Sequence, residues 1–204
     1  GGATTVNAAI DAGSGKAVTL KTTGGTLTLN NTLAASGGTV TLQAGAGITF
    51  ADTGDVTTGG GTLSLNAGTG GITMGLGTVL NAGAGQVSMT AGGTVALGSV
   101  ESTYSGNLSI TAAAVTGTQD GNIDILAPNA TLLVSTTGGI GSATSAIETR
   151  MSRLDATNTS TGGIFIEEAD ALAIGKVSQS ASGNVSVRTI SGAIDVLESG
   201  GSGI

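Results

Sequence analysis

The 204-residue chain contains no histidine, cysteine or tryptophan. Catalytic imidazoles, thiolate nucleophiles, disulfides and the usual zinc sites are therefore excluded. Only Phe50, Tyr104 and Phe165 are aromatic. Charged residues make up 9 % of the chain, against about 25 % in an average protein. The composition therefore argues against an enzyme and predicts no cofactor and no bound metal.

Positive charge is also scarce. Six basic and thirteen acidic residues give a net charge of −7. The basic surface typical of nucleic-acid binding is absent, and an anionic membrane surface is an unfavourable partner. No run approaches the roughly 18 consecutive apolar residues of a membrane-spanning helix. We therefore expect neither nucleic-acid binding nor membrane insertion.

Glycine is abundant, at 38 positions, and 39 % of the residues are hydrophobic. The aliphatic residues recur at regular intervals, which disfavours disorder. The chain has no initiator methionine and no signal segment, and its pattern is still running at Ile204. We expect residues 1–204 to be a single repetitive segment from within a longer protein.

The repeated unit is glycine followed by two aliphatic residues that alternate with polar ones, as in residues 38–42 and 61–65. The unit recurs about every 21 residues. Its first aliphatic positions are Val18, Val40, Leu63, Val87, Leu108, Ile123, Ile147, Ile164 and Val185. Alternation of this kind between glycine-rich turns predicts short β-strands.

Two further series follow within each unit. The second is a set of strand-like triplets that begin at Leu27, Ile48, Ile72, Val95, Leu172 and Ile194. The third is weaker and contains Leu33, Val56, Val79, Val100, Ile140 and Val177. The sequence therefore predicts three short strands per unit.

Units of this length can each wind once around an axis and stack as a parallel β-helix. Each strand then pairs with its equivalent one turn away, at a spacing of ~4.8 Å. The fold class is therefore all-β, a β-solenoid of about nine turns, with the two aliphatic residues of each triplet directed inward.

Two places depart from the rhythm. The step from Leu108 to Ile123 is short, which predicts the loss of a strand or corner around residues 112–115. Residues 146–158 contain good helix formers. We interpret them as a degenerate turn with Ile147 and Leu154 directed inward, and a short surface helix is the alternative.

The repeats resemble the β-helical shafts of filamentous-haemagglutinin-like exoproteins and related large bacterial surface adhesins. The resemblance extends over the whole chain and is strongest at residues 138–142, 146–150, 154–156 and 162–170. It implies a right-handed parallel β-helix, an extracellular or cell-surface location, and a role in adhesion or as a spacer.

The densest acidic cluster is Glu167, Glu168 and Asp170. Some parallel β-helices are carbohydrate-active enzymes that use carboxylates with a basic residue. A groove lined by Glu167, Asp170 and Arg188 would support that function. Adjacent strand residues point to opposite sides, however, and the sequence shows no aromatic sugar platform beside them. We therefore favour a solvated strand end without catalytic residues.

Other motifs have weaker functional interpretations. Asp120, Asn122 and Asp124 are spaced like part of a calcium loop, but the acid that would complete it is missing, which favours a plain turn. The outward hydroxyl groups could form a regular ladder that binds ice, although the pattern becomes irregular at Asp124, Phe165 and Ser186. Alternatively, they are simply the polar face of a sheet. The pairs of this ladder are Thr39/Thr41, Thr62/Ser64, Gln86/Ser88 and Asn107/Ser109.

Five Asn-x-Ser/Thr triplets match the acceptor motif for N-linked glycans, and we attribute them to chance. They begin at Asn30, Asn107, Asn129, Asn158 and Asn184. Phe165 lies between two aliphatic residues and points outward, either as a contact residue or packed against a loop.

The sequence as a whole predicts a structural shaft of a large secreted or cell-surface protein. Its ends would stack on flanking turns of the same protein or on further copies of itself. The alternative is a binding module that recognises a glycan or host protein through one solenoid face, and the host or matrix ligand is not identified.

Overall fold

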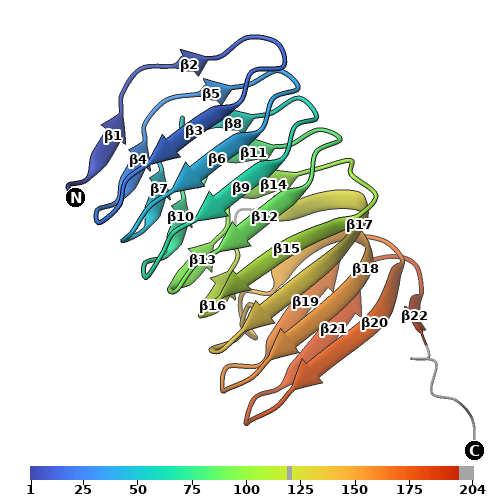
Figure 1. Ribbon diagram of the computed structural model, residues 1–204. Coiled ribbons are helices and arrows are strands. Elements are labelled where there is room, and N and C mark those ends of the chain that lie inside the picture. Colours follow the sequence, from blue (N-terminus) through green and yellow to red (C-terminus); the bar gives the residue numbers. More distant parts are fainter. Residues whose placement is uncertain (119–120, 198–204) are drawn as a thin grey trace, which may run out of the picture.

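The computed structural model describes residues 1–118 and 121–197. Within these residues every regular element is a strand, and none forms a helix long and apolar enough to cross a membrane. Each coil of the chain lies on the one before it, and β1 (Thr4–Val6) and β22 (Ile194–Val196) lie at opposite ends (Figure 1). All pairings between strands are parallel. The predicted β-solenoid of about nine turns is confirmed.

The coils share three faces. Face A contains β3 (Val18–Lys21), β6 (Val40–Gln43), β9 (Leu63–Asn66), β12 (Val87–Thr90), β15 (Asn107–Ala112), the second halves of β17 (Ile125–Thr136) and β18 (Ile147–Asn158), β20 (Leu172–Gln179) and β22. Face B contains β1, β4 (Leu27–Leu29), β7 (Ile48–Phe50), β10 (Ile72–Met74), β13 (Thr94–Ala96), β16 (Ala114–Thr116) and the first residues of β19 (Ile164–Glu168) and β21 (Val185–Thr189). Face C contains β2 (Ile10–Asp11), β5 (Leu33–Ala34), β8 (Val56–Thr57), β11 (Val79–Asn81), β14 (Ser99–Glu101), the first halves of β17 and β18, and the last residues of β19 and β21.

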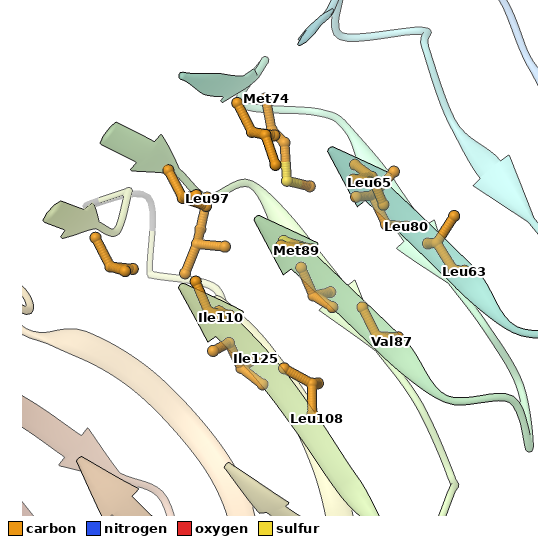
Figure 2. Packing of buried hydrophobic residues seen from close by; sticks show 14 of the residues in the cluster. Leu63, Leu65, Met74, Leu80, Val87, Met89, Leu97, Leu108, Ile110 and Ile125 are labelled. Carbon is orange, nitrogen blue, oxygen red and sulfur yellow. The ribbon is translucent and has the colours of Figure 1, made fainter. Parts of the chain in front are cut away.

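Aliphatic residues of successive coils stack in register inside the solenoid. One column on face A runs through Leu20, Leu42, Leu65, Met89, Ile110, Val134, Ala156 and Val177. These positions give roughly 22 residues per coil, close to the predicted 21. Figure 2 shows Leu63, Leu65, Val87 and Met89 directed into this core. Each buried aliphatic side chain contributes about 1.5–3 kcal/mol, and most of its contacts come from neighbouring coils.

The glycine that opens the repeated unit is required by close approach between coils. A Cβ atom on Gly61 would collide with the carbonyl of Gly38, and one on Gly85 would collide with the carbonyl of Gly61. These glycines lie one above another at the same corner. Larger residues would force the coils apart, which explains why the unit begins with glycine.

The predicted alignment of the series is wrong after Leu108. Leu108 pairs with Leu132, so this step is 24 residues long. No strand is lost near residues 112–115, because β15 ends at Ala112 and β16 begins at Ala114. Leu132 follows Pro128 and Asn129 rather than a glycine, so the repeated unit does not mark it. The first and second series consequently exchange faces, and Ile164 and Val185 lie on face B.

The third series is confirmed at Leu33, Val56 and Val100, is displaced by one residue at Val79, where β11 begins, and is wrong at Ile140 and Val177. Leu80, and not its neighbour Val79, pairs with Val56 and is buried. Ile140 belongs to face B, and Val177 belongs to face A. Three strands per coil occur only in the earlier coils. Later, β17 and β18 each run for 12 residues across two faces.

Residues 146–158 form neither a helix nor a degenerate turn, because β18 occupies most of this stretch as a continuous strand. The prediction that Ile147 and Leu154 point inward is confirmed, since both are buried. The helix-forming composition is overridden by pairing with β17, β19 and β20 on its two sides.

Candidate functional site

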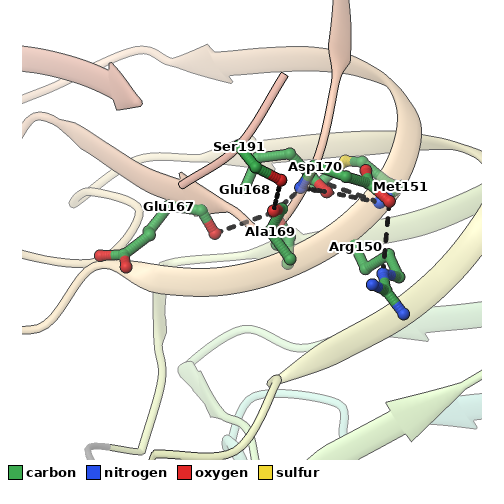
Figure 3. Close-up of polar contacts among 8 residues, drawn as sticks. Arg150, Met151, Glu167, Glu168, Ala169, Asp170 and Ser191 are labelled. Atoms are coloured by element: carbon green, nitrogen blue, oxygen red, sulfur yellow. Dashed lines mark hydrogen bonds and ion pairs between the residues drawn. The ribbon is translucent and has the colours of Figure 1, made fainter. Parts of the chain in front are cut away.

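The three acids of the predicted cluster diverge. Glu167 and Glu168 are neighbours on β19 and point to opposite sides, as predicted. Asp170 follows in the next corner and faces Arg150 (Figure 3). Glu168 is fully buried, so the prediction of a solvated strand end is wrong for this residue. The cluster is therefore divided. Glu167 lies on the other side of the strand, whereas the Asp170 amide lies 3.5 Å from Glu168 Oε1 and the two side chains also interact.

Glu168 occupies a core position on the inner side of face C. The column it belongs to begins with six aliphatic residues and ends with three polar ones, in the order Ile10, Leu33, Val56, Leu80, Val100, Ile125, Thr149, Glu168 and Thr189. A buried carboxyl group is stable only when its oxygens accept hydrogen bonds.

The Glu168 carboxyl group receives those hydrogen bonds from neighbouring coils. The Thr149 hydroxyl donates to Oε2 at 2.9 Å, and the Met151 amide lies 3.2 Å from both oxygens. Pairing of β18 with β19 ends at Thr149, and pairing with β20 begins at Arg153. Met151 lies between these two ladders, so the Glu168 side chain supplies the acceptor that a strand would otherwise provide.

Burial raises the pKa of Glu168 from 4.5 to about 7, against the opposing effect of the hydrogen bonds from Thr149 and Met151. A carboxyl group with a pKa near neutrality has the acidity of a general acid or base. Glu168 has no exposed surface through which a substrate would reach it. Its arrangement therefore serves packing of the corner rather than proton transfer to a ligand.

Arg150 and Asp170 form an ion pair on the outside of the same corner. Arg150 Nε lies 3.3 Å from Asp170 Oδ2, and each side chain is 47 % exposed. An exposed pair of this kind contributes about 0.2–1 kcal/mol. It borders a cavity of about 310 Å³ that also contacts Glu101, Leu126 and Pro128.

Glu167 lies in a different groove and forms an ion pair with Arg188. This groove has a volume of about 380 Å³, and Phe165 and Glu148 also line it. An aromatic ring, that of Phe165, thus lines the same groove as Glu167. Asp170 is not part of the groove, so the predicted trio of Glu167, Asp170 and Arg188 is only partly assembled.

Sequence reasoning missed Thr149, Glu148 and Arg150 as members of these environments. The signal was present, because residues 147–152 alternate between inward and outward positions with the period of two typical of a strand. The helix-forming composition of the segment concealed it.

The calcium-like motif has a structural role at Asp124. Asp120 lies outside the described residues. Asp124 is buried and accepts hydrogen bonds from the Thr118 amide and the Glu148 amide, both at 2.9 Å. Among residues 1–118 and 121–197, no three acidic side chains come together in a group that would hold a metal ion. The interpretation of this motif as a turn before a strand agrees with the structure.

The outward hydroxyls of face A do form a ladder. Thr41, Ser64, Ser88 and Ser109 pair in register, and the column continues with Leu133, Asp155 and Lys176. The predicted continuation through Asp124, Phe165 and Ser186 is wrong, because these residues belong to other faces. The change to apolar and charged residues favours a polar sheet face over an ice-binding lattice.

Asn158 differs from the other asparagines of the acceptor triplets. It is fully buried, accepts a hydrogen bond from the Thr136 hydroxyl at 3.1 Å, and donates to Gln179 Oε1 at 2.9 Å. These three side chains continue the register of the strands into a polar ladder inside the solenoid. Asn158 is thus a structural residue.

Comparison of the chain with protein-family models, curated proteins and solved structures finds no match. The resemblance to filamentous-haemagglutinin-like exoproteins therefore stays a prediction, and the function must be argued from the solenoid itself.

Proposed function

We propose that this chain is a shaft segment of a large secreted or cell-surface bacterial protein, and that its function is mechanical. The continuity of the interior columns is the observation that supports this function. Aligned residues run from Ile10 to Thr189 on face C and from Leu20 to Val177 on face A, without an interrupted coil.

This geometry suits a spacer. Each coil adds ~4.8 Å along the axis, so nine coils extend about 40 Å. The hydrogen bonds between strands lie along that axis, and every coil depends on its neighbours for burial. Added coils therefore lengthen the rod without needing a new type of core.

The terminal coils are suited to further stacking. At the β22 end, Val185 is 50 % exposed and Val196 is 69 % exposed, although both occupy inward positions of their columns. In this proposal another coil in the same register covers them, either from the same protein or from a second copy. The added coil would also pair with the open strand edges.

The proposal assigns no catalytic step to the chain. Glu168, whose pKa burial raises to about 7, is enclosed in the core. The extracellular location rests on the family resemblance. An acidic surface and the absence of cysteine are compatible with that location.

Sedimentation velocity and electron microscopy of the 204-residue chain would test the stacking. We expect association that increases with concentration and single-file particles one solenoid wide. Val185→Lys combined with Val196→Lys should abolish this association, because each would bury a charge between coils. Leu76→Lys is the matched control, since Leu76 is 68 % exposed but belongs to an inner coil. A chain that stays monomeric, or whose association depends on Leu76 instead, would contradict the proposal.

A further inference from the structure

The groove beside Glu167 has features of a binding site, which a purely mechanical role does not require. Glu148, Glu167 and Arg188 lie side by side on β18, β19 and β21, paired in register. They form a row across three coils on the outside of the solenoid, and the groove around them measures about 380 Å³. We propose that this groove binds a neutral saccharide.

The floor of the groove offers the hydrogen-bonding groups that a sugar requires. Carboxylates only accept hydrogen bonds, and a guanidinium group only donates them, whereas each sugar hydroxyl does both. Glu167 is 16 % exposed and is held by its ion pair with Arg188, which is 67 % exposed. One charged group is thus recessed and the other remains accessible, so a ligand can contact both without breaking the pair.

Phe165 provides the apolar surface. It points outward from β19 between Ile164 and Ile166, is partly buried, and lines the same groove. Gly163 holds this arrangement open, because a Cβ atom there would lie 2.8 Å from Phe165 Cε2. An aromatic ring beside a few fixed polar groups is typical of small-ligand sites.

A short loop forms the opposite wall. Ser142 and Ser145 make reciprocal backbone hydrogen bonds of 2.7 and 3.2 Å, and the Ser142 hydroxyl accepts a further one from the Ser145 amide at 3.1 Å. Ser142 and Thr144 both line the groove. The wall is therefore a braced turn that contributes two hydroxyl-bearing residues to the groove.

The charge of the groove favours a neutral ligand over an anionic polysaccharide or a cation. The floor carries two acidic residues and one basic residue, on a chain of net charge −7. A sulfated or uronic polysaccharide would be repelled. A divalent cation is also disfavoured, because within the described ranges no group of three acidic residues gathers at any point. A neutral oligosaccharide satisfies the donors, the acceptors and the ring together.

Nuclear magnetic resonance titration of the whole chain with cellopentaose, maltopentaose and mannopentaose would test this site. We expect at least one sugar to shift the amide resonances of Phe165, Ser186 and the 142–146 loop. Phe165→Ala and Arg188→Ala should each weaken that binding at least tenfold. Tyr104→Ala is the control, since Tyr104 is 36 % exposed and does not line this groove.

Phe165→Leu separates loss of the ring from loss of packing, because it keeps an apolar side chain of similar size. We expect this variant to retain the wild-type spectrum away from the groove and still to bind the sugar weakly. Absence of shifts with all three sugars would overturn the proposal. Shifts unchanged by Phe165→Ala, or tighter binding of heparin than of any neutral sugar, would also overturn it.

Discussion

The Thr149 hydroxyl donates a hydrogen bond of 2.9 Å to the Glu168 carboxyl group inside a column that six earlier coils fill with aliphatic residues. The two residues are paired neighbours on successive coils. The contact marks the corner at which β18 exchanges one strand partner for another. A polar pair replaces aliphatic packing there because the Met151 amide needs an acceptor.

The raised pKa of Glu168 predicts a pH-dependent stability. The folded chain binds this proton more tightly than the unfolded chain, whose carboxyl group titrates near 4.5. The free energy of unfolding should therefore increase as the pH falls from about 7 towards 4.5, and this increase amounts to about 3 kcal/mol at most. Glu168→Gln keeps the hydrogen-bond acceptor without the charge and should remove this component.

Urea unfolding followed by circular dichroism at several pH values would measure the difference between the two proteins. Glu101→Gln provides a control on the exposed side of face C. Equal pH dependence in the wild type and in Glu168→Gln would show that Glu168 is not the group responsible.

Truncation of a core side chain should destabilise the solenoid locally and globally. Leu65 is 1 % exposed and lies in the middle of the face A column. We expect Leu65→Ala to cost about 2–5 kcal/mol, as is usual for a buried leucine. Leu76→Ala should change the free energy of unfolding very little, since Leu76 is 68 % exposed. If denaturant titrations show that Leu65→Ala and Leu76→Ala lower the free energy of unfolding equally, the interior is not packed as described.

Substitution of a corner glycine tests the close approach between coils. In Gly61→Ala, the added methyl group collides with the carbonyl of Gly38, so the two coils must separate. We expect faster amide hydrogen exchange in β6 and β9 and a lower unfolding midpoint. Gly2→Ala is the matched control, because a Cβ atom at Gly2 meets nothing within 4 Å. Unchanged exchange in Gly61→Ala would refute this explanation of the repeated glycine.

The buried polar ladder of Thr136, Asn158 and Gln179 predicts that truncation of Asn158 lowers the free energy of unfolding. Asn158→Ala would leave the Thr136 hydroxyl and the Gln179 side chain without their shared partner. A buried polar group left without a hydrogen bond costs about 1–3 kcal/mol. Chemical denaturation would measure this cost, and Asn184→Ala, at an exposed asparagine, should be nearly neutral. A neutral Asn158→Ala variant would contradict a role for the ladder.

The fold was predictable because the aliphatic residues that stack in space also recur in the sequence. Val18, Val40, Leu63 and Val87 lie in one column both in the prediction and in the structure. The alignment failed at Leu132, because Pro128 and Asn129, which lie within β17, stand before it in place of glycine. Pairing between coils determines which residues align there, and it operates over distances that a local motif does not encode.

The polar environments were harder to predict. The opposite orientations of Glu167 and Glu168 follow from strand alternation, and the structure confirms them. The burial of Glu168 depends on the missing acceptor at Met151, which only the exchange between β19 and β20 creates. Phe165 shares the outward side of β19 with Glu167 by strand alternation, whereas Glu148 and Arg188 reach the same groove only through the register between coils.

Single-molecule force spectroscopy on the chain held at its two ends tests the central claim most directly. A shaft built from coils that are stabilised by their neighbours should release one coil at a time. Each event should lengthen the chain by about 75 Å, since roughly 22 residues extend at most ~3.3–3.6 Å each. Gradual extension at low force without discrete events would contradict a stiff solenoid that resists extension.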